Sequence, residues 1–207
     1  MERDPERPTG TCIVLVHPDG ERTMIPDAGA NDALELPELP PGAHLHLTGY
    51  TLLREGSRPA ALRALERARE QGIPVSVDPS SAAPLAGEPG FAGWVRGAAL
   101  LVPNADEARV LTGEPDPERA ARALAGGGRE VVVTLGGDGA LWSDGERVLR
   151  AAAEPAEVVD TTGAGDAFAA GLLAARAAGA GPAEQLAAGC TLAARAVGVQ
   201  GARPGYD

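Results

Sequence analysis

The nine residues Asp160–Phe168 have the composition and spacing best suited to chemistry in this chain. They read Asp-Thr-Thr-Gly-Ala-Gly-Asp-Ala-Phe and lead into an alanine- and leucine-rich segment that we expect to be helical. A glycine-rich turn at a helix start leaves backbone N–H groups unpaired, and with the helix dipole these groups form an anion site. Gly163 and Gly165 would let this backbone approach a phosphate closely. Asp166 follows directly, where a carboxylate can take a proton from an attacking hydroxyl.

A simpler interpretation makes Asp160 and Thr161 helix caps and the glycines a tight turn. Taken together, however, the nine residues resemble the C-terminal signature of the ribokinase-like (PfkB) carbohydrate kinase family. The resemblance implies that ATP is the phosphoryl donor and that Asp166 deprotonates the hydroxyl of the substrate. It also implies an anion hole for the transferred phosphoryl group, formed by Gly163, Ala164 and Gly165.

Asn104 and Glu107 form a second motif, Asn-Ala-Asp-Glu, at the expected start of another helix. The spacing alone is explained by a capping box, with Asn104 as the N-cap and Glu107 three residues into the helix. The motif also resembles the Asn-x-x-Glu motif of the same family. In that case Glu107 would organise Mg²⁺ and its water, and Asn104 would lie near the nucleotide phosphates.

The turn Thr134-Leu135-Gly136-Gly137-Asp138-Gly139 has the composition of a hairpin turn. It also matches the Thr-x-Gly-x-x-Gly turn of the family, which implies nucleotide contacts by Thr134, Gly136, Gly137 and Gly139. The resemblance further places Cys190 beside the adenine, although we favour the simpler interpretation of this residue as a buried, small, apolar thiol.

Two further sets of side chains are candidate ion sites. The resemblance implies that Asp160 and Thr162, with carbonyl groups near Gly201, bind a monovalent cation such as K⁺; helix capping is the alternative. His44 and His46 point to one face of an expected strand and form a possible metal pair. Because no third ligand is evident, we favour a pair whose ring nitrogens are satisfied within the protein.

The composition excludes several functional classes. The net charge of −11 argues against nucleic-acid binding, and no apolar run is long enough to cross a membrane. All 18 basic residues are arginine, which excludes a P-loop lysine or a Schiff base. Two distant cysteines suggest no disulfide framework, and the charged N-terminus lacks a secretory signal, so we expect a cytoplasmic protein.

Apolar runs that alternate with helical patterns predict an α/β fold. We expect a three-layer αβα sandwich with a mostly parallel sheet, as in ribokinase-like proteins. The expected strands are 43–49, 73–77, 98–102, 130–135, 140–142, 147–151 and 158–160, after a hairpin over 11–16 and 21–25. The expected helices are 57–71, a short one near Trp94, 104–111, 116–125, one from the signature to 178, and 182–197, with loops at 26–41 and 80–90. Ligands of such sheets bind beyond the carboxyl ends of the strands, where Asp78, Asn104, Thr134 and Asp160 would lie.

The chain is expected to be one domain, 1–207, with a lid hairpin at 11–26 and a nucleotide-binding core at 43–207. The resemblance implies that the chain starts at the second lid hairpin of the family, so that most residues that choose the sugar would precede it. We therefore predict an ATP-dependent phosphotransferase for a sugar or related small alcohol, which forms a homodimer through the hairpin. The alternative is a catalytically inactive, N-terminally truncated nucleotide-binding remnant with an interaction role.

Overall fold

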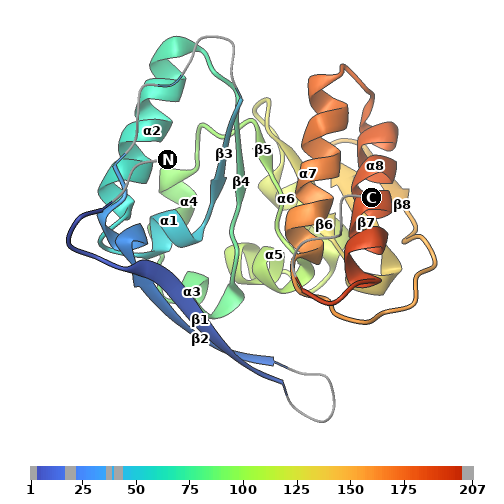
Figure 1. Ribbon diagram of the computed structural model, residues 1–207. Coiled ribbons are helices and arrows are strands. Elements are labelled where there is room, and N and C mark those ends of the chain that lie inside the picture. The colour runs from blue at the N-terminus through green and yellow to red at the C-terminus, as the bar shows by residue number, and fades with distance from the viewer. Residues whose placement is uncertain (1–3, 17–21, 36–38, 40–43, 202–207) are drawn as a thin grey trace.

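A computed structural model of the chain describes residues 4–16, 22–35, 39 and 44–201. It contains a six-stranded sheet and a separate two-stranded ribbon (Figure 1). The strands of the sheet lie in sequence order: β3 (Leu45–Thr48), β4 (Val75–Asp78), β5 (Leu100–Leu101), β6 (Glu130–Thr134), β7 (Ala140–Ser143) and β8 (Val148–Ala151). The pairs from β3 to β6 are parallel, whereas β7 and β8 are added antiparallel. The predicted mostly parallel sheet is therefore confirmed.

Helices cover both faces of this sheet, as the predicted three-layer sandwich requires (Figure 1). The helices are α1 (Tyr50–Leu53), α2 (Arg58–Gln71), α3 (Ala82–Ala86), α4 (Phe91–Trp94), α5 (Ala105–Thr112), α6 (Pro117–Leu124), α7 (Ala164–Ala177) and α8 (Pro182–Val197). The first six pack on one face, and α7 and α8 pack on the other. Strand β6 is apolar throughout its centre because its side chains enter both layers: Val131 and Val133 face the first core and Val132 the second.

Helix α2 has the predicted range, but its first turn and its buried face differ from a simple capped, leucine-lined helix. The helix ends as predicted at Gly72, whose φ of 65° is in the left-handed region. Ser57, the first residue of the expected helix, makes no side-chain cap; its hydroxyl instead donates to the Thr51 carbonyl at 3.0 Å. The buried stripe of the helix runs through small residues such as Ala61, Ala64 and Ala68, whereas Leu62 and Leu65 are half-buried.

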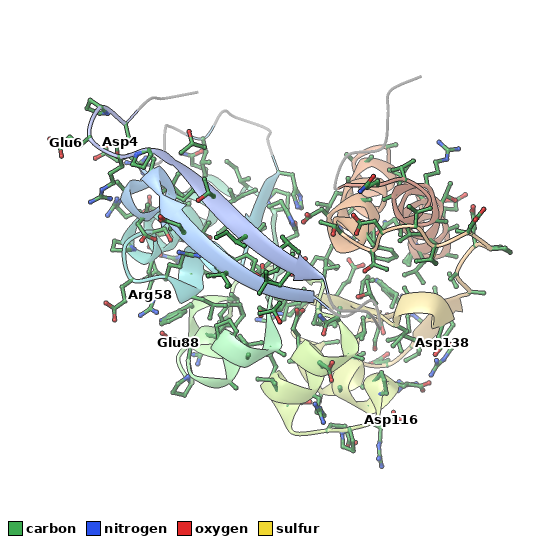
Figure 2. All side chains as sticks on the ribbon, turned by 60° about the horizontal axis from the view of Figure 1, so that its bottom comes forward. Asp4, Glu6, Arg58, Glu88, Asp116 and Asp138 are labelled. Atoms are coloured by element: carbon green, nitrogen blue, oxygen red, sulfur yellow. The ribbon has the colours of Figure 1, made fainter. Side chains whose placement is uncertain are left out.

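Two short helices, α1 and α3, were absent from the prediction, which had a loop over 80–90. At four and five residues they are too short for a periodic pattern, and packing holds them. Leu52 and Leu85 are the buried residues of these two helices. Close by, the Arg58 guanidinium pairs with Glu88 and lies over the ring of Trp94 (Figure 2).

Helices α7 and α8 lie side by side and approach each other closely at two glycines (Figure 1). A Cβ at Gly171 would clash with the backbone carbonyl of Ala188. A Cβ at Gly189 would lie 2.7 Å from the ring of Phe168. Only glycine therefore allows this helix pair its present separation.

The predicted hairpin is confirmed as β1 (Thr9–Val16) and β2 (Arg22–Gly29), followed by a 3₁₀ turn over Ala30–Ala33. The predicted turn, His17–Gly20, lies outside the described residues. Strand β2 runs four residues past its predicted end and passes through Pro26, which faces Cys12. Proline, which lacks an N–H, is tolerated here because each strand of a two-stranded ribbon has an open edge. The ribbon projects from the body of the molecule (Figure 1).

The predicted strand over 158–160 is wrong. The chain leaves the sheet at β8 and forms no regular element before α7. Val158 and Val159 remain 64% and 58% exposed, and the N–H groups of Val159 and Asp160 both donate to the Val197 carbonyl at the end of α8. This connection crosses to α7 over α8, so its backbone pairs with a helix end and not with a strand. Within the described residues, no helix is long and apolar enough to span a membrane.

Candidate active site

The signature turn forms the start of α7. Gly163 is the N-cap, and its φ of 78° is in the left-handed region that other residues rarely adopt. Ala164 and Gly165 begin the helix, and a Cβ added at Gly165 would meet open space. Asp166 is exposed in the first turn. The turn thus presents backbone and a carboxylate to an open region at the positive end of a fourteen-residue helix.

Asp160 ties this turn to the residues after α8. One carboxylate oxygen, Oδ1, accepts the N–H of Thr162 at 2.8 Å, and the other, Oδ2, accepts the N–H of Gly201 at 3.0 Å. The structure thus brings Asp160, Thr162 and Gly201 together, as the interpretation as a cation site required. These two hydrogen bonds of Asp160 hold the turn against the residues after α8, and the cation remains a prediction.

Asn104 and Glu107 form the complete capping box at the start of α5. The Asn104 side chain accepts the Glu107 N–H at 2.9 Å, while Glu107 accepts from the Asn104 N–H at 2.9 Å and from its Nδ2 at 2.7 Å. Glu107 is only 2% exposed, and burial, followed by the charge of Asp78, raises its pKa to about 7. The capping interpretation is therefore correct, and the metal role is untested by these contacts.

Asp78 is the carboxylate that the sequence placed at the carboxyl end of β4 without giving it a role. Burial raises its pKa to about 6, the Ser80 N–H lowers it through a 2.6 Å bond, and the charge of Asp166 raises it again. Ser80 holds a φ of 73°, which is unusual for a residue with a side chain. Asp78, Glu107 and Asp166 therefore form one electrostatically linked group at the carboxyl edge of the sheet.

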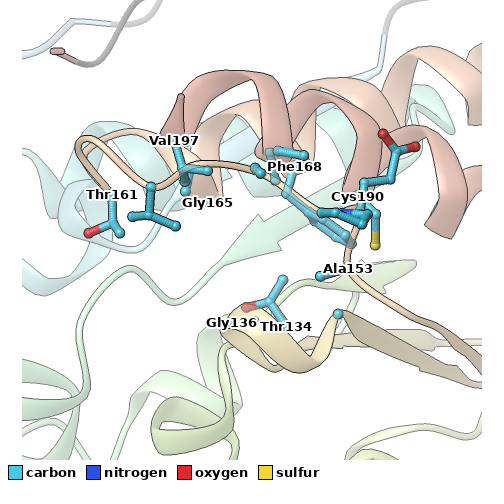
Figure 3. Close-up of a pocket in the computed structure, with 17 residues that line it drawn as sticks. Thr134, Gly136, Ala153, Thr161, Gly165, Phe168, Cys190 and Val197 are labelled. Carbon is cyan, nitrogen blue, oxygen red and sulfur yellow. The ribbon is translucent and has the colours of Figure 1, made fainter. Parts of the chain in front are cut away.

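A cavity of about 470 Å³, here called the α7–α8 cavity, opens at the signature turn, where Ala164 and Gly165 line it (Figure 3). Seven predicted site residues line it: Thr134, Gly136, Gly137, Gly139, Ala164, Gly165 and Cys190. Asn104 is joined to this wall because it forms a β-bridge with Thr134. The Cys190 thiol is buried, and burial followed by the charge of Glu154 raises its pKa. The predicted site residues of the turn after β6 and those of α7 and α8 thus line one cavity.

Several lining residues were not identified from the sequence. They come from the irregular connection after β8 and from α8, and they are Ala153, Glu154, Pro155, Ala156, Val158, Ala193, Ala194 and Val197. Most are small and apolar and carry no motif. The stretch of alanines on the last helix was the only signal for part of this wall.

A second cavity of about 590 Å³, here called the hairpin cavity, lies between the base of the ribbon and the start of α1 and α2. One face of the ribbon lines it through Cys12, Met24 and Pro26. The polar side chains in its wall include Asp27, Asn31, Thr48 and Arg54.

His44 and His46 do not form a metal pair. His44 Nε2 and His46 Nδ1 each lie 2.8 Å from the same hydroxyl, Oγ of the fully buried Ser76. Burial is the main cause that lowers the pKa of both imidazoles. Among the described residues, no three His, Cys, Asp or Glu side chains are grouped so as to hold a metal ion.

Comparison with known proteins identifies the family. The family model described as pfkB family carbohydrate kinase matches residues 1–207. A ribokinase of Arabidopsis thaliana is 32% identical over 210 residues, which cover 95% of this chain and 54% of that protein.

Two solved structures extend the likeness to the fold. An adenosine kinase from Sinorhizobium meliloti has a TM-score of 0.87 at 28% sequence identity. The match covers 95% of this chain and 63% of the adenosine kinase chain. A fructokinase from Vibrio cholerae O395 has a TM-score of 0.79 at 28% sequence identity. The match covers 96% of this chain and 70% of the fructokinase chain. The chain spans about half the length of the ribokinase it matches. The chain belongs to the pfkB carbohydrate kinase family.

Proposed function

We propose that this protein transfers the γ-phosphoryl group of ATP to the hydroxyl of a sugar or related small alcohol. The observation that carries the proposal is the placement of Asp166 at the start of α7, directly after Ala164 and Gly165, which line the α7–α8 cavity. The family membership supports the same reaction type. The open space at Gly165 leaves room for a phosphoryl group against the backbone.

In this reaction Asp166 accepts the proton of the substrate hydroxyl, which then attacks the γ-phosphorus in line with the leaving oxygen. The N–H groups around Gly163, Ala164 and Gly165 stabilise the charge on the transferred group.

The α7–α8 cavity is the proposed nucleotide site. Its backbone-rich floor at Thr134, Gly136, Gly137 and Gly139 suits the phosphates and ribose, and Asn104 supports that floor through its bridge to Thr134. Its apolar wall, which includes Phe168 and Cys190, suits a flat base. The Vibrio cholerae fructokinase was solved with fructose, ADP and a calcium ion, and a double mutant of it with fructose, ADP and a potassium ion.

Glu107 and Asp78 are the residues that would hold a Mg²⁺ ion, directly or through water. Glu107 and Asp78 offer carboxylate oxygens, and each has a raised pKa that a nearby cation would relieve. Bound Mg²⁺ would neutralise charge on the phosphates. Asp160 and Thr162 would hold the monovalent cation that steadies the turn, at the point where Asp160 already contacts Gly201.

The hairpin cavity is the proposed acceptor side, because its polar wall can hydrogen-bond a polyol while the ribbon covers it. The opposite face of the ribbon carries Ile13, Leu15 and Ile25, which are 61%, 49% and 53% exposed. Apolar exposure of this kind on a ribbon with open edges favours self-association. We propose a homodimer through this face.

The substitution Asp166→Asn tests the reaction. It should lower kcat by on the order of 10²–10⁴ and leave the Kd of Mg·ATP nearly unchanged, since the amide keeps the shape but cannot accept the proton. Phosphorylation of a panel of sugars and nucleosides, with calorimetry for ATP, measures both quantities. Near-normal turnover in the variant would refute the role of Asp166. ATP binding without any turnover in the wild type would instead favour the inactive nucleotide-binding alternative.

A further inference from the structure

Glu154 is the one charged side chain among the described residues that line the α7–α8 cavity. It lies on the irregular connection between β8 and α7, three residues after the strand ends at Ala151. The rest of the wall near it is apolar, with Ala153, Cys190 and Ala193. A lone carboxylate at the rim of an apolar slot is the kind of group that fixes the orientation and choice of a ligand.

The Glu154 carboxylate is held at this position by α8. The Thr191 hydroxyl donates to Oε1 of Glu154 and also lies 3.0 Å from the Ala187 carbonyl one turn earlier. In the described part of the chain this hydroxyl is the only hydrogen-bond donor to the carboxylate. An ionised carboxylate accepts several hydrogen bonds, so capacity remains at Oε2.

The carboxylate lies at the end of the cavity away from the signature turn. The connection touches α8 at two places: Glu154 at Thr191, and Val159 with Asp160 at Val197. These points on α8 are six residues apart, or about 9 Å at 1.5 Å per residue. Figure 3 shows the same order, with Thr161 and Gly165 at one end and Ala153 and Cys190 at the other. A phosphate chain at the turn therefore places the nucleobase next to Glu154.

We propose that Glu154 selects the nucleobase by accepting a hydrogen bond from the exocyclic amino group of adenine, and that Thr191 positions its carboxylate. The inference rests on the proposed nucleotide site. Small apolar side chains discriminate poorly between flat bases, whereas a polar group that requires a partner discriminates strongly. A negative acceptor favours a base edge with an N–H donor and disfavours one that offers only lone pairs. The separation from the turn keeps this charge away from the phosphates.

Calorimetry with two nucleotides tests the proposal. Mg·ATP is compared with the Mg complex of purine riboside triphosphate, which lacks only the amino group. The wild type should bind ATP about tenfold more tightly, the value expected for one hydrogen bond to a charged group. Glu154→Ala should reduce this preference to less than about twofold, mainly by weakening ATP. Glu154→Gln keeps an acceptor oxygen and should retain an intermediate preference.

Two matched variants separate base selection from a purely structural tie. Thr191→Val removes the hydroxyl that positions the carboxylate but keeps the carboxylate itself, so its preference for ATP should lie between those of the wild type and Glu154→Ala. Glu157→Ala removes a carboxylate from the same connection outside the cavity wall and should leave both affinities unchanged. If Glu154→Ala and Thr191→Val weaken both nucleotides equally, Glu154 is only a tie between the connection and α8, and the proposal is wrong.

Other outcomes are equally decisive. Equal binding of the two nucleotides by the wild type would refute base selection while leaving the nucleotide site intact. Tighter binding of GTP than ATP would overturn the assignment to adenine, since the N1–H and 2-amino groups of guanine can pair with both carboxylate oxygens. Failure of every nucleotide to bind would overturn both this inference and the proposed function.

Discussion

The two cavities of this molecule are built in different ways. The α7–α8 cavity is lined by residues from one continuous part of the chain, between Thr134 and Val197, and by backbone and small side chains. The hairpin cavity is lined by residues between Gly10 and Ser57, and one face of the ribbon contributes Cys12, Met24 and Pro26 to its wall. The first is supported by two packed helices and the sheet. The second depends on a ribbon that packs little against the body.

This difference separates a rigid half from an adaptable half. Val132, Leu172 and Leu186 are fully buried behind the α7–α8 cavity, so its shape is fixed by close packing. On the ribbon only Ala28 of the described side chains is buried. We expect the rigid α7–α8 cavity to bind the phosphoryl donor, which is common to many kinases. We expect the more adaptable hairpin cavity to bind the acceptor, which differs between kinases. The three predictions below test this contrast.

The ribbon offers the largest expected effect, because its two faces can be changed separately. Ile13 and Ile25 face each other across the strands on the outer face, and Val14 and Met24 do so on the cavity face. The double variant Ile13→Ser/Ile25→Ser should convert a dimer to a monomer. In a symmetric dimer each protomer loses two apolar side chains, four in all, at about 1–2 kcal/mol each. The dissociation constant of the dimer should therefore rise by more than about 100-fold.

The matched variant Val14→Ser/Met24→Ser should leave the dimer largely intact and weaken acceptor binding instead. Sedimentation equilibrium measures the first effect and acceptor KM the second. A wild-type protein that is monomeric at all concentrations would contradict the proposed dimer. Loss of the dimer in both variants alike would show that the two faces are not functionally distinct.

The same contrast explains what the sequence could predict. The half around the α7–α8 cavity was predictable because its elements are local: a β-branched run gives β6, and glycines at 163 and 113 mark a helix start and end with positive φ. The predicted α/β sandwich, the hairpin and the helix boundaries around Asn104 and Pro182 agree with the structure. The capping box at Glu107 was also readable from spacing alone.

The failures involve residues whose structure depends on distant contacts. Val158–Asp160 has the composition of a strand, but the N–H groups of Val159 and Asp160 pair with the Val197 carbonyl at the end of α8. Glu154 belongs to no periodic pattern, and its position in a cavity wall follows from its contact with Thr191, 37 residues later. The same holds for Asp78, whose raised pKa reflects burial and the charge of Asp166, and not its own neighbours in sequence.

Gly189 offers a smaller effect that is confined to the rigid half. The substitution Gly189→Ala places a methyl group 2.7 Å from the ring of Phe168, which lines the α7–α8 cavity, so the ring must move. We expect a loss of about 1–3 kcal/mol in the free energy of unfolding and weaker binding of Mg·ATP, with acceptor KM unchanged. Gly93→Ala is the control, since a Cβ there meets no atom within 4 Å. Urea denaturation and calorimetry measure both quantities; unchanged ATP affinity would show that Phe168 does not shape the site.

The smallest expected effect concerns Asp78, which lies at the end of β4 and is linked electrically to Asp166. Its folded pKa of about 6 lies above its ordinary value of 3.8. The folded state therefore binds the proton more tightly, and the stability that this provides is complete below about pH 3.8 and is lost as the pH rises through about 6. Asp78→Asn keeps the Oδ1 acceptor for the Ser80 N–H and removes the titration.

Relative to the wild type, Asp78→Asn should therefore gain on the order of 1 kcal/mol in unfolding free energy between pH 5 and pH 8. His46 has the opposite effect on stability, because its lowered pKa contributes stability at neutral pH that is lost as the pH falls. His46→Gln should therefore be less stable than the wild type at neutral pH, and this difference in unfolding free energy should become smaller in acid. Urea titrations at several pH values measure both differences. If Asp166→Asn leaves the pH dependence of stability associated with Asp78 unchanged, the two carboxylates do not interact.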